Sequence, residues 1–253
     1  MDKYSLHGNG LEAVEGAVQK VVAECMKKLD QPYQSYDVTK DIDSHDENRR
    51  YGIQDAVWAS AYGYRPYSVV HPPEPDRTAK PYPQSVITAL SGRDKHGRAI
   101  APDTKAANGR EIPRGGCQGE ADRTVRVPYD YPEGLEAARA VYFDGFKASL
   151  SDRRVKKIFQ QWSSCMAGKG LTYQSPLAAM GSQEFAEGEV SAHERDVALA
   201  DINCKNEVNL VPRWNAVEAD IERQMISKRS KVLENFLQLQ TEKIQAAKGL
   251  LKQ

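Results

Sequence analysis

Four cysteines constrain this chain more than any other feature, because two of them belong to a repeated motif. Cys25 and Cys165 are each followed directly by methionine and, eight positions after the cysteine, by the tripeptide Tyr-Gln-Ser. Both copies of this CM-x6-YQS motif close a stretch in which apolar residues recur at helical spacing. A matched sequence in a matched context indicates two related halves, each with a cysteine near the end of a helix.

The repeat predicts how the cysteines pair. Each half contains one further cysteine downstream, so we expect Cys25 to bond Cys117 and Cys165 to bond Cys204. Closing such long intervals would stabilise the fold by roughly 4 kcal/mol apiece. The alternative is four buried free thiols, which are common in cytosolic proteins. A metal site has little support, since no CxxC pair or nearby histidine gives ligand spacing.

Helical periodicity predicts a mainly α fold, a helical bundle with two disulfide-linked, weakly repeated halves. The N-terminal half, residues 1–150, would contain a helix over 10–29, an irregular segment over 32–113 and helices over 116–150. The C-terminal half, residues 151–253, would end in a long helical hairpin made of helices 189–211 and 213–251. Pro212 would either interrupt this hairpin or lie in the first turn of its second helix.

The irregular segment is rich in proline and tyrosine, which favours extended backbone wrapped around a helical core. Rigid aromatic rings give contact area at small entropic cost, so its tyrosines could bind a peptide, a glycan or a partner protein. The alternative is that they fasten the segment onto the core. The possible partner-binding residues are Tyr62, Tyr64, Tyr67 and Tyr82, together with Trp214 and Phe236 on the apolar stripe of the last helix.

Composition narrows the functional class. Hydrophobic residues make up 40% of the chain, enough for a core, and 35 basic residues balance 35 acidic ones. A formal net charge of zero argues against a general nucleic-acid binder or a polybasic membrane-surface protein. No apolar stretch approaches the roughly 18 residues of a membrane helix. Residues 1–7 lack an apolar signal core, so the chain is either cytoplasmic or without its leader.

Motifs of known chemistry are missing from the sequence. There is no HExxH, GxSxG or GxxxxGK[ST] pattern, so we assign no catalytic residue, metal ligand or cofactor. The run 45–47, His-Asp-Glu, could contribute to a metal or acid–base site, although a solvated loop is the simpler interpretation. Asp201 lies near the apolar face of its helix, where a buried carboxylate would need a partner such as Arg153 or Arg154.

Four short motifs resemble a known group when taken in order. They are Arg-Tyr-Gly-Ile at 50–53, Gly-Gly-Cys-Gln-Gly-Glu-Ala at 115–121, Gln-Trp-Ser-Ser-Cys-Met at 161–166 with Gly170 and Tyr173, and Val-Ala-Leu-Ala-Asp-Ile-Asn-Cys at 197–204. Together they resemble uncharacterised secreted proteins and lipoproteins of Streptomyces and other actinobacteria. The resemblance implies export, and a lipid anchor on an N-terminal cysteine that this chain does not contain.

These observations together predict a non-enzymatic extracytoplasmic binding or scaffold protein of the cell envelope. Disulfides point to an oxidising compartment, and the resemblance suggests a protein partner associated with a transporter. The alternative is a secreted enzyme whose site is assembled from sequence-distant residues. A deep pocket with convergent polar groups would favour the enzyme, and burial of the C-terminal stripe would weaken the binding interpretation.

Overall fold

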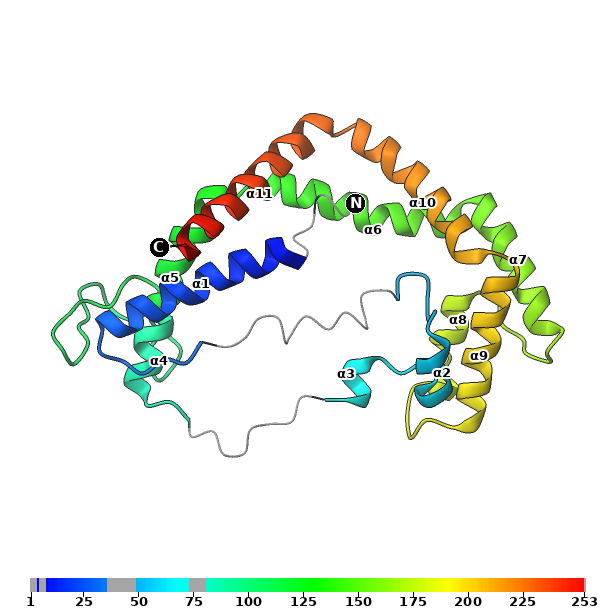
Figure 1. Ribbon diagram of the computed structural model, residues 1–253, viewed down its shortest axis with the longest axis horizontal. Helices are drawn as coiled ribbons and strands as arrows, with labels where there is room; N and C mark the ends of the chain where they lie inside the picture. Colours follow the sequence, from blue (N-terminus) through cyan, green and yellow to red (C-terminus); the bar gives the residue numbers. More distant parts are fainter. Residues whose placement is uncertain (1–3, 5–7, 36–48, 73–80, 253) are drawn as a thin grey trace. The chain divides into compact units, whose positions relative to one another are not determined.

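The computed structural model describes residues 4, 8–35, 49–72 and 81–252, and most of these are helical (Figure 1). Within these ranges the only β structure is two isolated bridges. The mainly α fold class is therefore confirmed. The chain forms two compact units, which we describe separately. Unit 1 comprises Met1–Ile42, Asp76–Ala138 and Arg229–Gln253, and unit 2 comprises Asp43–Pro75 and Arg139–Lys228.

Unit 1 has an aliphatic core between helices. In Figure 1, α1 lies with α4 and α5, and these helices contact one another, as do α1 and α11. Their buried side chains are alanine, valine, leucine, methionine and cysteine, with Val14, Met26 and Val125 almost fully enclosed. The elements are α1 (Gly8–Lys28), α4 (Gln84–Ser91), α5 (Gly116–Ala121), a π-helical turn (Asp122–Arg126), a 3-10 turn (Val127–Tyr129), the start of α6 (Pro132–Ser151) and α11 (Ser230–Leu251).

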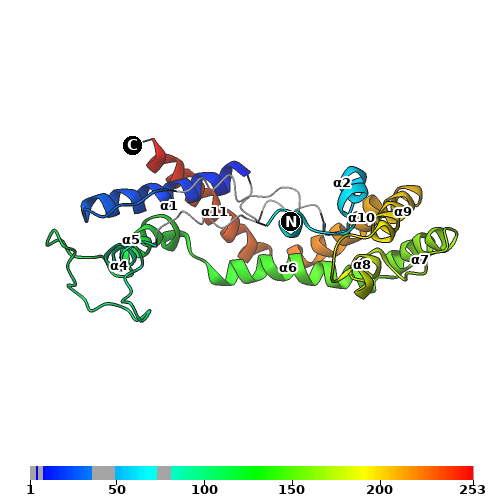
Figure 2. The ribbon, with the colours of Figure 1, turned by 90° about the horizontal axis from the view of Figure 1, so that it is seen from below.

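Unit 2 has an aromatic core that also contains charged groups. Figure 2 shows α7, α8, α9 and α10 gathered together with α2. Trp162 and Trp214 are completely buried, and Glu194, Asp201 and Lys205 of α9 are at most 2% exposed. The elements are α2 (Ala56–Tyr62), α3 (Tyr67–Val70), the rest of α6, α7 (Arg153–Ala167), α8 (Pro176–Met180), a 3-10 turn (Gln183–Phe185), α9 (Ala192–Glu207) and α10 (Leu210–Ser227).

Each unit contains one disulfide, and both pairings match the expectation from the repeat. Cys25 of α1 bonds Cys117 of α5 in unit 1, with a Cα–Cα distance of 5.5 Å. Cys165 of α7 bonds Cys204 of α9 in unit 2, with a Cα–Cα distance of 5.7 Å. The alternative of four free thiols is therefore wrong.

The two CM-x6-YQS motifs end their helices with the same capping motif. In the first, Gln31 N–H donates to Met26 O at 3.0 Å, and Asp30 has a left-handed φ of +55°. In the second, Leu171 N–H donates to Met166 O at 3.0 Å, and Gly170 has a φ of +78°. This is the Schellman arrangement, in which a left-handed residue lets the chain satisfy the last helical carbonyls. The two motifs therefore share the structure of the helix end as well as the sequence.

The expected helix over 213–251 is wrong, because two helices occupy this stretch. α10 ends at Ser227 and α11 begins at Ser230. The run Ser-Lys-Arg-Ser-Lys at 227–231 carries no apolar side chain, so packing does not favour a continuous helix there. The long hairpin does not form as one element either, since α10 packs on α9 and α11 packs on α1. Pro212 lies in the first turn of α10.

The two compact units also differ from the expected halves 1–150 and 151–253. The irregular segment is divided between them, and the C-terminal helix joins the N-terminal unit. α11 presents Leu233, Phe236 and Ala247 as buried residues. Because α1 and the turns after α5 leave an apolar face that the N-terminal segments alone do not cover, a helix from the far end of the chain completes that core.

Candidate functional site

Four rings from α2, α3 and the residue after α3 lie together in unit 2. We call this set the aromatic cluster, and it consists of Trp58, Tyr62, Tyr67 and His71. The ring centroids of Trp58 lie 4.4 Å from Tyr62 and 5.5 Å from Tyr67, and those of Tyr67 and His71 are 4.6 Å apart. His71 is exposed and the other three are partly exposed. Such tilted and edge contacts add stability beyond area burial.

Exposed aliphatic residues lie on the same two short helices. Val57 of α2 is 81% exposed and Val69 of α3 is 59% exposed. Single exposed apolar residues are ordinary, but these two lie on the same short helices as the partly exposed rings.

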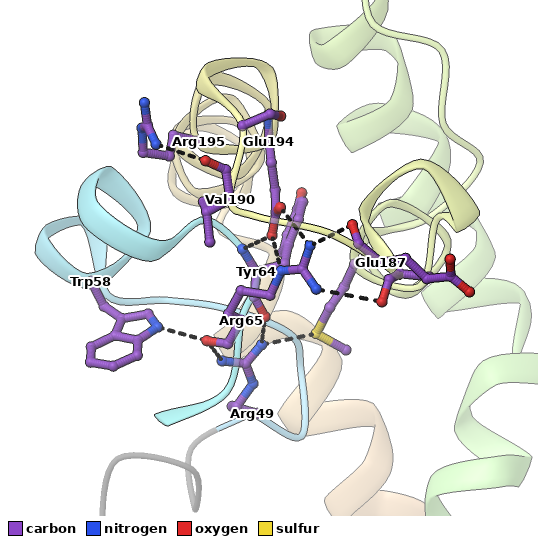
Figure 3. A network of polar contacts seen from close by, with 11 residues as sticks. Arg49, Trp58, Tyr64, Arg65, Glu187, Val190, Glu194 and Arg195 are labelled. Carbon is purple, nitrogen blue, oxygen red and sulfur yellow. Dashed lines mark hydrogen bonds and ion pairs between the residues drawn. The ribbon is translucent and has the colours of Figure 1, made fainter. Parts of the chain in front are cut away.

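Helix α9 fixes the position of this surface through buried charges (Figure 3). Arg65, just after α2, lies against the Glu194 carboxylate, with its Nε 3.2 Å from Oε1. The backbone N–H of Tyr64 donates to the same oxygen at 3.1 Å. Gly63 ends α2 with a φ of +56°, and a Cβ there would lie 2.7 Å from Glu194 Cγ. A glycine is therefore needed for this close approach.

The Arg65 carbonyl links this ion pair to the aromatic cluster. Trp58 Nε1 donates to Arg65 O at 2.8 Å, and Arg49 donates to the carbonyls of Arg65 and Tyr64 (Figure 3). Arg65 Nη2 donates both to Glu194 Oε2 and to Glu187 O, each at 3.3 Å. These bonds connect the segment over 49–65 to α9 and to the loop before it, so the rings stand on a firmly fixed backbone.

A second buried group of α9 binds the same segment. Lys205 Nζ lies 2.9 Å from Asp201 Oδ2 and donates to Ile53 O at 2.8 Å. Tyr64 Oη and Trp162 Nε1 donate to the two Asp201 oxygens at 3.2 and 3.0 Å. Burial raises the pKa of the Asp201 carboxyl and lowers the pKa of the Lys205 ammonium. The ion pair opposes both shifts and satisfies the carboxylate.

The partner suggested for Asp201 from the sequence was wrong. Arg154 pairs instead with Asp152 and Asp220 on the surface, at 3.0 and 2.8 Å. Lys205, four positions after Asp201 on the same helix, is close enough to enter the core with it. The structure thus gives Asp201 a partner one helical turn away.

The structure separates the residues expected to bind a partner. Tyr62 and Tyr67 join the aromatic cluster, whereas Tyr64 is 4% exposed and belongs to the core beside Asp201. Tyr82 lies in unit 1, just before α4, and is 46% exposed. The sequence interpretation missed Trp58 and His71. A signal existed, because each lies four positions from a tyrosine of the cluster at helical spacing.

Trp214 and Phe236 were expected to contact a partner, and that expectation is wrong. Each side chain is buried inside its own unit. Trp214 is fully buried with its ring 5.5 Å from Phe146, and its Nε1 donates to Ser149 Oγ at 2.7 Å. Phe236 is 3% exposed and packs against Gly134. An apolar stripe on a helix looks alike in sequence whether it faces a core or a partner.

The buried carboxylates do not form an open site. Glu218, for example, accepts from Arg50 Nε and from Tyr51 Oη, each at 2.8 Å. Across the described ranges no three His, Cys, Asp or Glu side chains are grouped as metal ligands would be. The run over 45–47 lies outside the described residues. None of the described helices has the length and apolar character needed to cross a membrane.

Comparisons with known proteins give little information about this chain. No family model matches the chain, and no solved structure matches it. A stretch of 85 residues, 34% of this chain, is 32% identical to a thiamine-phosphate synthase of Levilactobacillus brevis. The match spans 35% of that protein, so the chain covers about a third of the curated relative. A match of this extent assigns no family and transfers no activity.

Proposed function

We propose that this protein is a non-enzymatic binding or scaffold protein of the cell envelope, which docks a protein partner through the aromatic cluster. The observation that supports the proposal is the partly exposed aromatic cluster, whose backbone segment is bound by buried ion pairs that involve α9. Preorganised aromatic side chains bind with little loss of conformational entropy. A transporter component is the partner that the actinobacterial resemblance suggests.

Export is the second part of the proposal, and the disulfides support it. Both bonds join sequence-distant helices, and each lies within a separate unit. Bonds of this kind persist in oxidising compartments and are rare where glutathione keeps thiols reduced.

A cross-linking experiment tests the docking surface. A photoreactive residue at the exposed position 61 of α2 should capture one defined envelope protein in the source organism, and adding the double substitution V57E/V69E should abolish that capture. Both valines are largely exposed, so the charges should leave the fold intact. Val127, which is 55% exposed in unit 1, provides the matched control as V127E. Equal capture by both variants would remove the aromatic cluster from the proposal.

The compartment can be tested separately with thiol alkylation. Protein taken from the source cell and alkylated without reduction should carry no label, because no cysteine is free. Prior reduction should add four labels, which serves as the positive control. Four labels without reduction would contradict the extracytoplasmic placement while leaving the docking surface open to its own test.

A further inference from the structure

A tandem structural repeat lies in unit 1 between α4 and α5. Two turns follow each other at an offset of twelve positions, and we call them the twin turns, residues 93–100 and 105–112. Arginine or lysine begins each turn, and Gly-Arg-x-Ile ends each one, at 97–100 and at 109–112. The two isolated bridges of the described chain, Arg93 with Ala99 and Lys105 with Glu111, occupy equivalent positions.

The hydrogen bonds of the twin turns repeat with the same offset. Asp94 N–H donates to Arg98 O and Ala106 N–H donates to Arg110 O, both at 2.8 Å. The next bonds of each turn are equivalent as well, from Gly97 to Asp94 O and from Gly109 to Ala106 O at 2.9 Å. Backbone bonds this similar show that the two sequences adopt the same turn.

The base of the twin turns is closed by backbone contact. A Cβ on Gly92 would lie 2.5 Å from Gly116 N. The backbone before the twin turns can therefore approach the backbone after them only because both positions are glycine. At the second turn, Asn108 Nδ2 and Arg110 each donate to Lys28 O, the last residue of α1, at 3.0 Å. The Cys25–Cys117 disulfide lies next to this base. The turns are therefore presented on a fixed support.

Basic side chains dominate this part of an otherwise neutral chain. Between positions 92 and 116 there are six basic residues and three acidic ones. All six are exposed, and one acidic residue, Asp94, is paired with Arg98 at 2.9 Å. The neighbouring end of α1 adds the exposed Lys27 and Lys28, which are followed by the exposed Asp30. The six are Arg93, Lys95, Arg98, Lys105, Arg110 and Arg114.

We propose that the twin turns bind a linear polyanion whose phosphate groups repeat along its chain. The positive charges are spread over two exposed turns instead of converging on one point, which suits an extended ligand better than a single small anion. Two equivalent turns can contact one chain at two places and gain avidity. The segment over 92–116 has no exposed large hydrophobic residue that would insert into a lipid layer.

The probe for this proposal is long-chain inorganic polyphosphate, measured by titration calorimetry over a range of salt concentrations. K95Q/K105Q removes one charge from each turn, at side chains that are exposed. Each lost phosphate contact lowers the slope of log affinity against log salt by about 0.7, as for single-stranded polyanions. The double variant should therefore bind about tenfold more weakly near physiological salt, with a slope shallower by about 1.4.

Matched controls separate this surface from general electrostatics. K156Q/K157Q removes the same charge from exposed positions of α7 in unit 2 and should bind polyphosphate like the parent protein. V57E/V69E should also bind normally, so this proposal and the docking proposal fail independently. Equal weakening in both lysine variants, or no polyphosphate binding, would overturn the inference.

Two further probes identify the source of the phosphate. Orthophosphate should bind far more weakly than the polymer, since it cannot contact both turns. Vesicles of anionic phospholipid should not sediment the protein at physiological salt. Tight orthophosphate binding would indicate a small-anion site, and sedimentation with vesicles but no polymer binding would indicate a lipid surface. Either result would contradict the polyanion assignment.

Discussion

Unit 1 and unit 2 are each closed by one interhelical disulfide, yet their interiors differ in chemistry. The buried residues of the main core cluster of unit 1 are aliphatic side chains, Met26 and the cysteines, and this cluster buries no aromatic ring and no charged group. The core of unit 2 contains buried tryptophans and tyrosines beside Glu194, Asp201, Lys205 and Glu218. We relate this difference in core chemistry to the segments that each core holds in place. Helices α1 and α11 pack through apolar faces, whereas the segment over 49–72 combines buried residues such as Tyr51 and Ile53 with main-chain bonds to charged side chains of α9.

Buried ion pairs position an irregular segment in a way that apolar contacts do not. Apolar packing tolerates alternative arrangements of similar volume, but a desolvated charge is stable only where its partner lies. In unit 2, the partners of Lys205 and Glu194 include Ile53 O and Tyr64 N–H, so main-chain atoms of the segment complete the network. We infer that these charges define where the aromatic cluster stands.

The largest expected effect comes from removing a disulfide. C25A/C117A should destabilise unit 1 by roughly 4–5 kcal/mol, and C165A/C204A should destabilise unit 2 by roughly 4 kcal/mol, because the sequence separations are 92 and 39. All three tryptophans lie in unit 2, so their fluorescence during urea unfolding reports that unit, while circular dichroism reports helices of both. A tryptophan midpoint that moves equally in both variants would mean that the units unfold as one.

A smaller loss is expected from breaking the buried pair of α9. K205M should destabilise unit 2 by about 3 kcal/mol, near the lower end for such a change, because Tyr64 and Trp162 still bind Asp201. The tryptophan midpoint in urea measures this. D201N/K205M should recover part of the loss, since the uncompensated charge is gone.

A matched lysine in unit 1 provides the control for that comparison. Lys20 Nζ donates to Leu250 O at 3.0 Å in partly buried surroundings, and no carboxylate of the described residues pairs with it. K20M should cost less than about 1 kcal/mol by circular dichroism, as for a single neutral-acceptor hydrogen bond. A cost equal to that of K205M would mean that burial of the lysine stem, and not the ion pair, distinguishes the units.

The smallest effect is acid dependence on the surface of unit 2. The Arg154 guanidinium donates to the carboxylates of Asp152 and Asp220. These bonds hold the pKa of each carboxyl below the usual value for aspartate. A depressed pKa gives stability that is present above the unfolded value, near 3.8, and is lost as pH falls through the folded value. The tryptophan midpoint should therefore fall below about pH 4.

Two arginine variants isolate this contribution. The raised pKa of buried Asp201 acts in the opposite direction and in the window above the unfolded value, near 3.8, so the parent profile combines a loss of stability below that pH with a gain on descending towards it. R154Q should flatten the acid-dependent fall, whereas R153Q, at the exposed position beside it, should keep the parent profile. Identical profiles for both variants would assign the acid dependence to other groups.

Local patterns predicted much of the fold correctly. The helix expected over 10–29 is α1, and the cysteine pairing followed from two copies of one motif. The same logic could have found Lys205 as the partner of Asp201, since four positions separate them on one helix. It could also have joined Trp58 to Tyr62. These features depend on residues within one or two helical turns.

Other features depended on segments far apart in the chain. Tyr62 and Tyr64 differ by two positions, yet one ring is partly exposed and the other is buried against Asp201. The stripe of Phe236 could face a partner or a core with equal plausibility until α1 is seen beside α11. No pattern in the sequence distinguishes these cases, because burial is decided by which distant surface is complementary.

The sequence by itself determined the mainly helical fold class, the helix that corresponds to α1 and the two disulfides, since periodicity and a repeated motif act over short distances. Only the tertiary structure decided that the last helix completes the first unit and that the segment over 49–72 is bound by the charges of α9. Those outcomes require apolar faces and ion-pair partners from remote parts of the chain to meet, and that meeting lowers the free energy only in the assembled fold.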